Sequence, residues 1–225
     1  MDSCAVRVDG LSKSYAGRKT ETLQDLSFSI ERGEFACILG PSGCGKSTLL
    51  NIIAGIDRPS SGVVEVADLN LSEMKDEELT AFRRENIGFI FQFFNLLPTF
   101  SVYENISLPL EIKGCFDEQA KKRVCELIEE LGLTAQKDSL PAQLSGGEMQ
   151  RTAIARAIIH GPRIVLADEP TGNLDSENGE KVLNLLKDIN SHKGITIIMV
   201  THSKEAASCA SSTFLMRDGR FENGK

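Results

Sequence analysis

The 225-residue sequence predicts an α/β fold, built on a parallel sheet with a helical insertion at roughly 72–160. Two patterns predict it. An apolar run, Phe35–Leu39, has the composition of a buried strand and leads into a Gly-rich loop at 40–45. A helix then begins at Lys46 and is expected to stop near Gly55.

The second pattern lies further along the chain. Apolar segments at 164–167 and 195–200 flank a helical segment at 176–190. A strand, a helix and a second strand in this order form a crossover unit, and such units pair their strands in parallel. Together the two patterns predict an α/β core.

Shorter sequence patterns predict the remaining elements. The alternating segments Val6–Val8 and Leu26–Ile30 predict half-buried strands. Val63–Val66, which follows the Pro59–Gly62 turn, predicts another. The region 72–160 reads as mostly helical.

That helical region carries two start signals. Ser101 with Glu104, and Ser145 with Glu148, have the spacing of capping boxes, in which each side chain satisfies a backbone N–H of the other residue. An apolar stripe at helical spacing ends at Gly132; its members are Ala120, Val124, Leu127, Ile128 and Leu131.

Composition excludes several functional classes. There are 25 basic and 32 acidic residues, for a net charge of −7. This argues against a nucleic-acid surface, which needs clustered Lys and Arg; we interpret Arg83-Arg84 as a solvated helix face. No apolar stretch approaches the ~20 residues of a membrane span, and residues 1–4 do not resemble a secretory signal. The six cysteines form no CxxC pair, which favours a reducing cytosol over a disulfide framework.

The Gly-rich loop fits the phosphate-binding pattern GxxxxGK[ST], placed between a strand and a helix as that pattern requires. Its backbone N–H groups and the helix N-terminus are suited to bind an anion, with Lys46 on the β- and γ-phosphates and Ser47 on Mg²⁺. The predicted nucleotide-binding residues of this loop are Gly40, Pro41, Ser42, Gly43, Cys44, Gly45, Lys46, Ser47 and Thr48.

A pair of carboxylates follows the strand at 164–167. Asp168, at the strand edge, is placed to hold Mg²⁺ directly or through water. Glu169 points the opposite way and is expected to orient, or take a proton from, the water that attacks the γ-phosphate.

The octet Leu144–Arg151, LSGGEMQR, precedes Asp168 by about twenty residues. It resembles the signature sequence of ATP-binding cassette (ABC) proteins. The resemblance implies a P-loop ATPase core with a mostly parallel sheet, a small antiparallel β subdomain and a helical subdomain at roughly 93–160, all in one ATP-binding domain over 1–225. It also implies a head-to-tail dimer that binds ATP between the subunits, with Ser145, Gly146, Gly147 and Glu148 facing the other subunit's phosphate loop.

Other positions resemble the remaining family motifs. Gln92 corresponds to the glutamine that touches Mg²⁺ and the attacking water, and Asp175 to the loop that signals across the dimer. His202 corresponds to the switch histidine that contacts the γ-phosphate, although Ser203 departs from the Asp that often follows it. Tyr15 resembles the aromatic residue that stacks on adenine, but it is also suited simply to pack on the small sheet.

Segments 91–99, 102–106 and 168–175 resemble the subgroup of lipoprotein-release and macrolide-export ATPases. This implies an ATP-hydrolysing transporter subunit with ATP and Mg²⁺ as cofactors, no nucleic-acid partner, and a position on the inner face of the membrane beneath separate membrane subunits. Phe93–Pro98 is assigned to the groove that receives them; packing inside the helical subdomain is the alternative.

Two other functions stay open. A regulatory ATPase like the cell-division cassette would carry the same motifs without moving a cargo. A DNA-repair or ribosome-associated cassette is disfavoured by the lack of a second cassette, of zinc-ligand spacing and of a basic surface. Within the phosphate loop, we expected Cys44 to be a partly accessible, low-pKa thiol that maleimide would modify, because it lies at a helix N-terminus beside Lys46.

Overall fold

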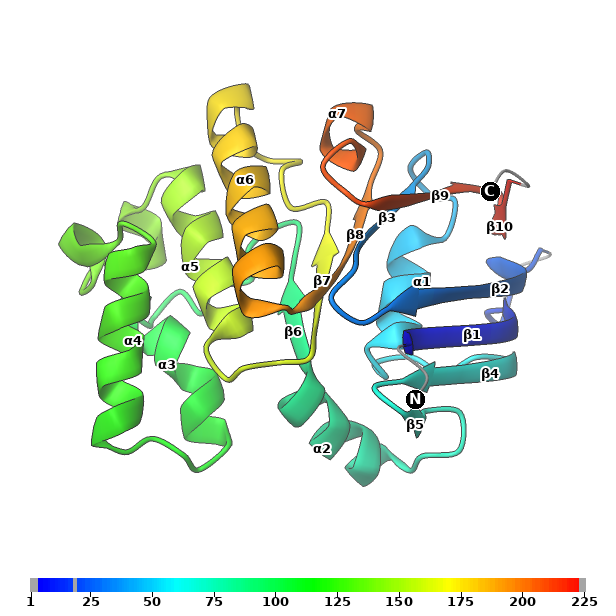
Figure 1. The fold of residues 1–225 in the computed structure, drawn as a ribbon, viewed down its shortest axis with the longest axis horizontal. Coiled ribbons are helices and arrows are strands. Elements are labelled where there is room, and N and C mark those ends of the chain that lie inside the picture. Colours follow the sequence, from blue (N-terminus) through cyan, green and yellow to red (C-terminus); the bar gives the residue numbers. More distant parts are fainter. Residues whose placement is uncertain (1–3, 18–19, 223–225) are drawn as a thin grey trace.

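The computed structural model describes residues 4–17 and 20–222 and contains two sheets flanked by helices (Figure 1). The larger sheet has six strands in the order β10-β9-β3-β8-β7-β6. Every neighbouring pair in it is parallel except β9 with β10, which form an antiparallel hairpin. Its strands are β3 (Phe35–Leu39), β6 (Ile87–Ile90), β7 (Ile164–Asp168), β8 (Thr196–Thr201), β9 (Ser212–Arg217) and β10 (Arg220–Phe221).

The smaller sheet is antiparallel, in the order β2-β1-β4-β5. Its first strand is longer than the three residues expected at 6–8, because its hydrogen-bonded register with both neighbours extends well beyond them. The strands are β1 (Cys4–Lys13), β2 (Leu23–Glu31), β4 (Ser61–Val66) and β5 (Leu69–Asn70).

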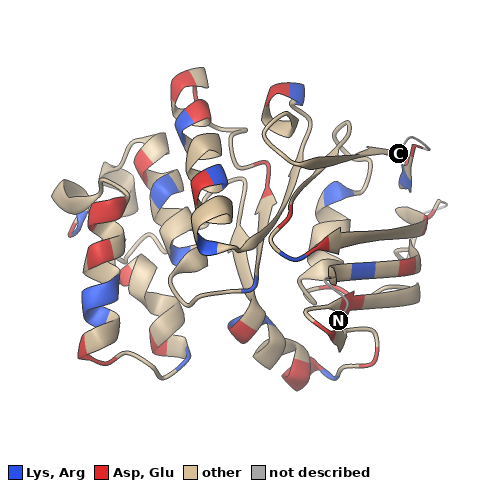
Figure 2. Cartoon of the chain, viewed as in Figure 1, with Lys and Arg blue, Asp and Glu red and all other residues tan. Residues whose placement is uncertain are grey.

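Helix α1 lies between the two sheets, while α5 and α6 cover the opposite face of the larger sheet and pack in turn against α3 and α4 (Figure 1). The helices are α1 (Lys46–Ile53), α2 (Asp76–Asn86), α3 (Val102–Ile112), α4 (Glu118–Glu130), α5 (Gly146–Ile158), α6 (Ser176–Lys193) and α7 (Lys204–Ala207), with short 3-10 turns at Thr134–Gln136 and Pro141–Gln143. Both acidic and basic residues lie along α4 and α6 (Figure 2).

The sequence signals for helix starts and crossovers are confirmed. Ser101 and Ser145 each accept a hydrogen bond from the backbone N–H three residues on, and the two glutamates complete both capping boxes. Strands β7 and β8 pair in parallel on either side of α6 in sequence. The prediction of an α/β fold with a parallel core is therefore correct.

Close packing of α5 on β6 depends on Gly88. A Cβ atom added there would lie 2.1 Å from the carbonyl oxygen of Ala157. Only glycine permits this approach, which sets α5 directly against the strand that leads to Gln92.

Among the described residues, no helix is both long and apolar enough to span a bilayer. The expectation that residues 1–4 do not form a secretory signal depends mostly on residues 1–3, which lie outside the described part.

Candidate nucleotide-binding site

The phosphate loop connects β3 to α1, as its sequence predicts. Gly45 is the N-cap of α1, with φ 109°, and a Cβ there would lie 2.8 Å from the carbonyl oxygen of Thr22. No side chain caps this helix, and its first turn contains no acidic residue. The first N–H groups of α1 are therefore left for an anionic ligand.

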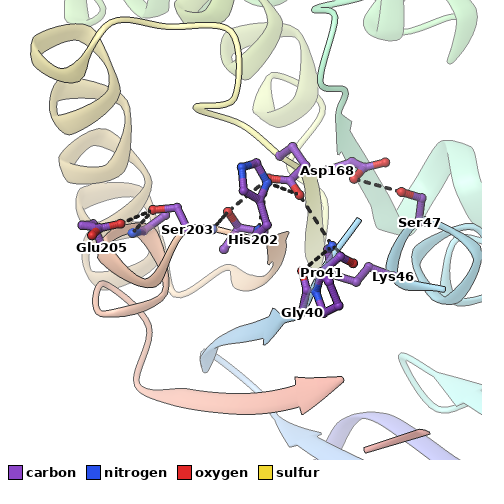
Figure 3. A network of polar contacts seen from close by, with 11 residues as sticks. Gly40, Pro41, Lys46, Ser47, Asp168, His202, Ser203 and Glu205 are labelled. Carbon is purple, nitrogen blue, oxygen red and sulfur yellow. Dashed lines mark hydrogen bonds and ion pairs between the residues drawn. The ribbon is translucent and has the colours of Figure 1, made fainter. Parts of the chain in front are cut away.

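Lys46 is buried, with 6% of its surface exposed. Its Nζ donates to the carbonyl oxygens of Gly40 (2.8 Å) and Pro41 (3.1 Å) (Figure 3). The same Nζ lies 3.7 Å from Oε1 of Glu169. The ammonium group is thus held within the loop by two hydrogen bonds to carbonyl groups and by an ion pair with a carboxylate.

Ser47 and Asp168 are brought together from α1 and the end of β7. The Ser47 hydroxyl donates to Oδ1 of Asp168 at 3.2 Å (Figure 3). Burial raises the pKa of the Asp168 carboxyl group; the Ser47 hydrogen bond opposes the shift, as does Lys46, and the charge of Glu169 adds to it. Desolvation is therefore the dominant influence on the ionisation of this carboxyl group.

Glu169 faces away from Ser47, towards β8. Its backbone has φ 47°, a left-handed conformation that costs free energy for any residue with a Cβ. Oε2 accepts from the Thr201 hydroxyl at 3.1 Å, and Nδ1 of His202 donates to Oε1 at 3.0 Å. The residue is 9% exposed, so Glu169 is largely buried.

Gln92 follows β6 and reaches the same area. The Asn173 side chain donates to its carbonyl oxygen at 2.6 Å. A Cβ on Gly172 would lie 3.5 Å from Nε2 of Gln92. The loop after Gln92 and the loop after Glu169 are therefore in contact.

Ser145 and its neighbours adjoin α6 instead of the phosphate loop. A Cβ on Gly147 would lie 2.7 Å from Oδ1 of Asn178. Asp175 caps α6 by accepting from the backbone and side-chain nitrogens of Asn178, and these bonds lower the pKa of its carboxyl group. Among the described residues, no hydrogen bond or ion pair is recorded between 145–148 and the 40–48 loop.

A cleft of about 640 Å³ lies beside these residues, between α6, α7 and the loops that lead to them. Its lining includes Glu169, Asp175 and His202. The carboxylates and the imidazole thus border open space on one side of the site.

Tyr15 is 37% exposed. Its hydroxyl donates to Oδ2 of Asp57 at 2.6 Å, and Nζ of Lys13 lies 4.7 Å from the ring centroid. The ring is thus fixed by its hydroxyl and by a cation over it.

The expectation for Cys44 is wrong. The residue is 5% exposed, and burial raises the pKa of its thiol; Lys46 and two backbone hydrogen bonds oppose this shift without reversing it. The expected low pKa took account of the helix N-terminus and of Lys46, but not of the desolvation of the thiol by burial. The sulfur turns inward, lying 2.9 Å from where a Cβ on Gly40 would be.

Sequence reasoning missed two residues that organise the site. Thr201 (1% exposed) holds Glu169, and Asn173 holds Gln92. The only sequence feature that could have indicated a role for Thr201 is its position at the end of a strand, directly before His202. Ser203, the departure from the family pattern, accepts from the N–H of Ala206 and so caps α7.

A family model described as "ABC transporter" matches residues 23–172. The chain belongs to the ABC transporter family. An uncharacterised ABC transporter ATP-binding protein of Mycobacterium tuberculosis is 44% identical over 96% of this chain and 88% of its own length. The lipoprotein-releasing ATP-binding protein LolD of Idiomarina loihiensis is 41% identical over 97% of each chain.

A solved structure is also similar. The ATP-binding cassette MJ0796, in a dimeric post-hydrolysis state bound to ADP and Pi, superimposes with a TM-score of 0.89 at 40% identity, over 98% of this chain and 97% of that one. The chain is therefore an ATP-binding subunit of an ABC transporter and an ATPase with the cassette fold. The regulatory alternative is not favoured, because these ABC relatives are described as transporter or lipoprotein-releasing proteins.

Proposed function

We propose that this ABC subunit hydrolyses MgATP to drive lipoprotein release or export through separate membrane subunits. The similarity to LolD, which spans 97% of both chains, carries this proposal. The whole chain then acts as one ATP-binding domain on the cytoplasmic face of the membrane, with 93–160 as its helical subdomain.

The site suits a magnesium ion between phosphate and protein. Mg²⁺ prefers oxygen ligands and takes few from the protein when phosphates supply the rest. Ser47 and Asp168 present two oxygens 3.2 Å apart, and the Asp168 carboxylate is half-buried at the end of β7. With Gln92 they would hold the ion, which supplies neutralisation of phosphate charge when bound.

ATP binding would draw Lys46 from the Gly40 and Pro41 carbonyl groups to the β- and γ-phosphates. Glu169, relieved of that ion pair, orients the attacking water and takes its proton. His202 holds Glu169 through Nδ1 and has its other ring nitrogen for the γ-phosphate. Catalysis is then largely positioning and charge stabilisation.

The second half of each site would come from another copy of the chain. Ser145, Gly146, Gly147 and Glu148 form a second Gly-rich helix start that is not linked to the 40–48 loop of the same chain. In a head-to-tail dimer they would contact the γ-phosphate on the partner, with Asp175 beside the shared cleft. The dimeric form of MJ0796 supports this arrangement.

Tyr15 would stack on adenine through its ring, which the Asp57 hydrogen bond holds in place. Stacking gives affinity without reading the edges of the base. The backbone N–H groups of the 40–48 loop would hold the phosphates.

The membrane subunits would dock on the segment Phe93–Pro98 and the neighbouring groove. Phe93 is 70% exposed, and Ile112 is 61% exposed at a groove of about 260 Å³ between α2, α3 and α5. Exposed apolar side chains in one region favour a protein contact over a solvated surface.

Affinity purification from detergent-solubilised membranes, with mass spectrometry of the co-purifying protein, tests the proposal. We expect a membrane protein with a large extracytoplasmic domain. Recovery of a cell-division membrane protein instead would support the regulatory alternative.

A further inference from the structure

The loop after Gln92 contains two consecutive non-glycine residues in the left-handed region. Phe94 has φ 60° and Asn95 has φ 48°. Asparagine tolerates this conformation, whereas a bulky aromatic residue rarely adopts it. Two local backbone hydrogen bonds accompany it: the Phe94 N–H donates to the Phe91 carbonyl oxygen (3.1 Å) and the Asn95 N–H to that of Phe93 (2.6 Å). An interaction from outside the loop is needed to keep such a conformation populated.

Arg156, in the last turn of α5, makes that interaction. Nη1 donates to the carbonyl oxygen of Asn95 at 2.6 Å, and Nη2 donates to that of Phe94 at 2.8 Å. The two nitrogens of one planar guanidinium thus donate to two successive carbonyl groups, and this forked hydrogen bond fixes the orientation of both peptide planes. Lysine, with a single nitrogen, cannot reproduce this fork.

The guanidinium has an unusual environment for a structural arginine. It lies between α5 and the loop, and burial lowers its pKa. Among the described residues, no carboxylate is recorded within ion-pairing distance of it. Arg156 is half-buried and also lines the groove between α2, α3 and α5, so the two backbone carbonyl groups replace the part of its hydration that packing removes.

The loop is tied at its other end as well. Asn173 donates to the carbonyl oxygen of Gln92 itself, two residues before Phe94. Gln92 is therefore fixed between the segment that follows Glu169 and the C-terminal end of α5. Ser145 is the N-cap of the same helix, so α5 connects the loop after Gln92 with the residues proposed to contact the partner's ATP.

We propose that Arg156 is a positioning residue for ATP hydrolysis: its fork holds Phe94 and Asn95 in the left-handed conformation and so sets Gln92 in the site. This inference rests on the role proposed above for Gln92. It predicts that relieving the strain at Phe94 compensates for the loss of the fork, because glycine adopts positive φ without cost.

The experiment compares Arg156→Gln, Arg156→Lys and the double variant Phe94→Gly/Arg156→Gln, with Arg123→Gln, an exposed arginine of α4, as the matched control. Steady-state ATPase rates are normalised to folded protein. We expect Arg156→Gln and Arg156→Lys to lower kcat at least tenfold with KM for ATP changed less than twofold. The double variant should recover at least threefold in kcat over Arg156→Gln, and the control should match the unmodified protein.

Hydrogen–deuterium exchange provides a readout independent of activity. In Arg156→Gln, amides in 92–97 should exchange at least tenfold faster, while those of β6 stay unchanged. If Arg156→Gln alone is not recovered folded, Arg156→Lys and the double variant carry the comparison.

An unchanged kcat in Arg156→Gln, or a loss that Phe94→Gly does not restore, would overturn the inference and leave Arg156 a purely structural residue. Gln92→Ala separates this from failure of the proposed function. If Gln92→Ala hydrolyses ATP at the normal rate, the role assigned to Gln92 is wrong and the inference fails with it. If Gln92→Ala is slow while Arg156→Gln is normal, only the inference fails.

Discussion

Nζ of Lys46 lies 3.7 Å from Oε1 of Glu169, and both side chains are largely buried. The P-loop lysine is therefore paired with the carboxylate that we assign to water activation. Under the proposed function, an incoming γ-phosphate would compete with Glu169 for the same ammonium group. We expect this single contact to couple the binding of ATP to the release of Glu169 for catalysis.

The first prediction concerns Glu169→Gln. The amide cannot take a proton from water, so we expect turnover to fall by at least the ~10²–10⁴ typical of a lost general base. ATP binding should persist, since Lys46 loses a competing charge. The bound ATP should then hold two chains together, which size-exclusion chromatography with ATP measures. A variant that stays monomeric and hydrolyses ATP normally would remove Glu169 from this role.

The second prediction concerns the origin of Ser145 in each site. Mixing Ser145→Arg chains with Lys46→Ala chains gives hybrid dimers with one site free of both changes and one that carries both. If Ser145 acts on the partner's ATP, the mixture should bind ATP at one site per hybrid, while each variant alone binds poorly. Equilibrium dialysis with labelled ATP measures this. A mixture that binds no more than the sum of its parts contradicts the arrangement.

The third prediction replaces the expectation of a reactive Cys44. Because burial raises the pKa of this thiol and covers it, maleimide should modify the exposed Cys115 and Cys125 at least ~10-fold faster. Mass spectrometry of the labelled peptides over time measures the three rates. If maleimide labels Cys44 as fast as it labels Cys115, and MgATP slows the labelling of Cys44, then the thiol is accessible and reactive and this prediction is wrong.

The fourth prediction follows from the raised pKa of Asp168. Its folded-state pKa exceeds the ordinary 3.8, so the folded protein binds this proton more tightly than the unfolded chain. The protonated carboxyl group therefore contributes its full stabilisation of the folded state below about pH 3.8, and this stabilisation is lost as the pH rises through the folded-state pKa. Asp168→Asn, which avoids the charge, should therefore increase the free energy of unfolding at pH 7, with a gain that shrinks as pH falls.

Urea unfolding between pH 7.5 and 4.5 measures that gain, with the exposed Asp188→Asn as control. MgATP should reverse the order, because only the unmodified protein gains stability from binding it. If Asp168→Asn is less stable than the unmodified protein at pH 7 without nucleotide, the burial penalty is not the dominant effect at this carboxylate.

Much of the site was readable from sequence because its signals are local. The phosphate loop and both capping boxes depend on residues within a few positions of one another, and the chain geometry follows directly from them. Asp168 and Glu169 were separable for the same reason, since consecutive residues at a strand end point in opposite directions. The resemblance of the octet at 144–151 added the family, which the comparison with known proteins confirmed.

Tertiary structure decided what depends on residues far apart in sequence. Thr201 and Asn173 reach Glu169 and Gln92 only because parallel strands end at the same sheet edge. Apart from the position of Thr201 directly before His202, their local sequence does not indicate a role. Cys44 was misjudged because desolvation is a sum over all packed neighbours, whereas the helix dipole and an adjacent lysine are visible locally. The hydrogen bond from Arg156 to Asn95, in the loop after Gln92, likewise joins residues that are 61 positions apart in the sequence. Sequence thus determined which groups can do chemistry, and packing determined their ionisation, their access to solvent and their partners.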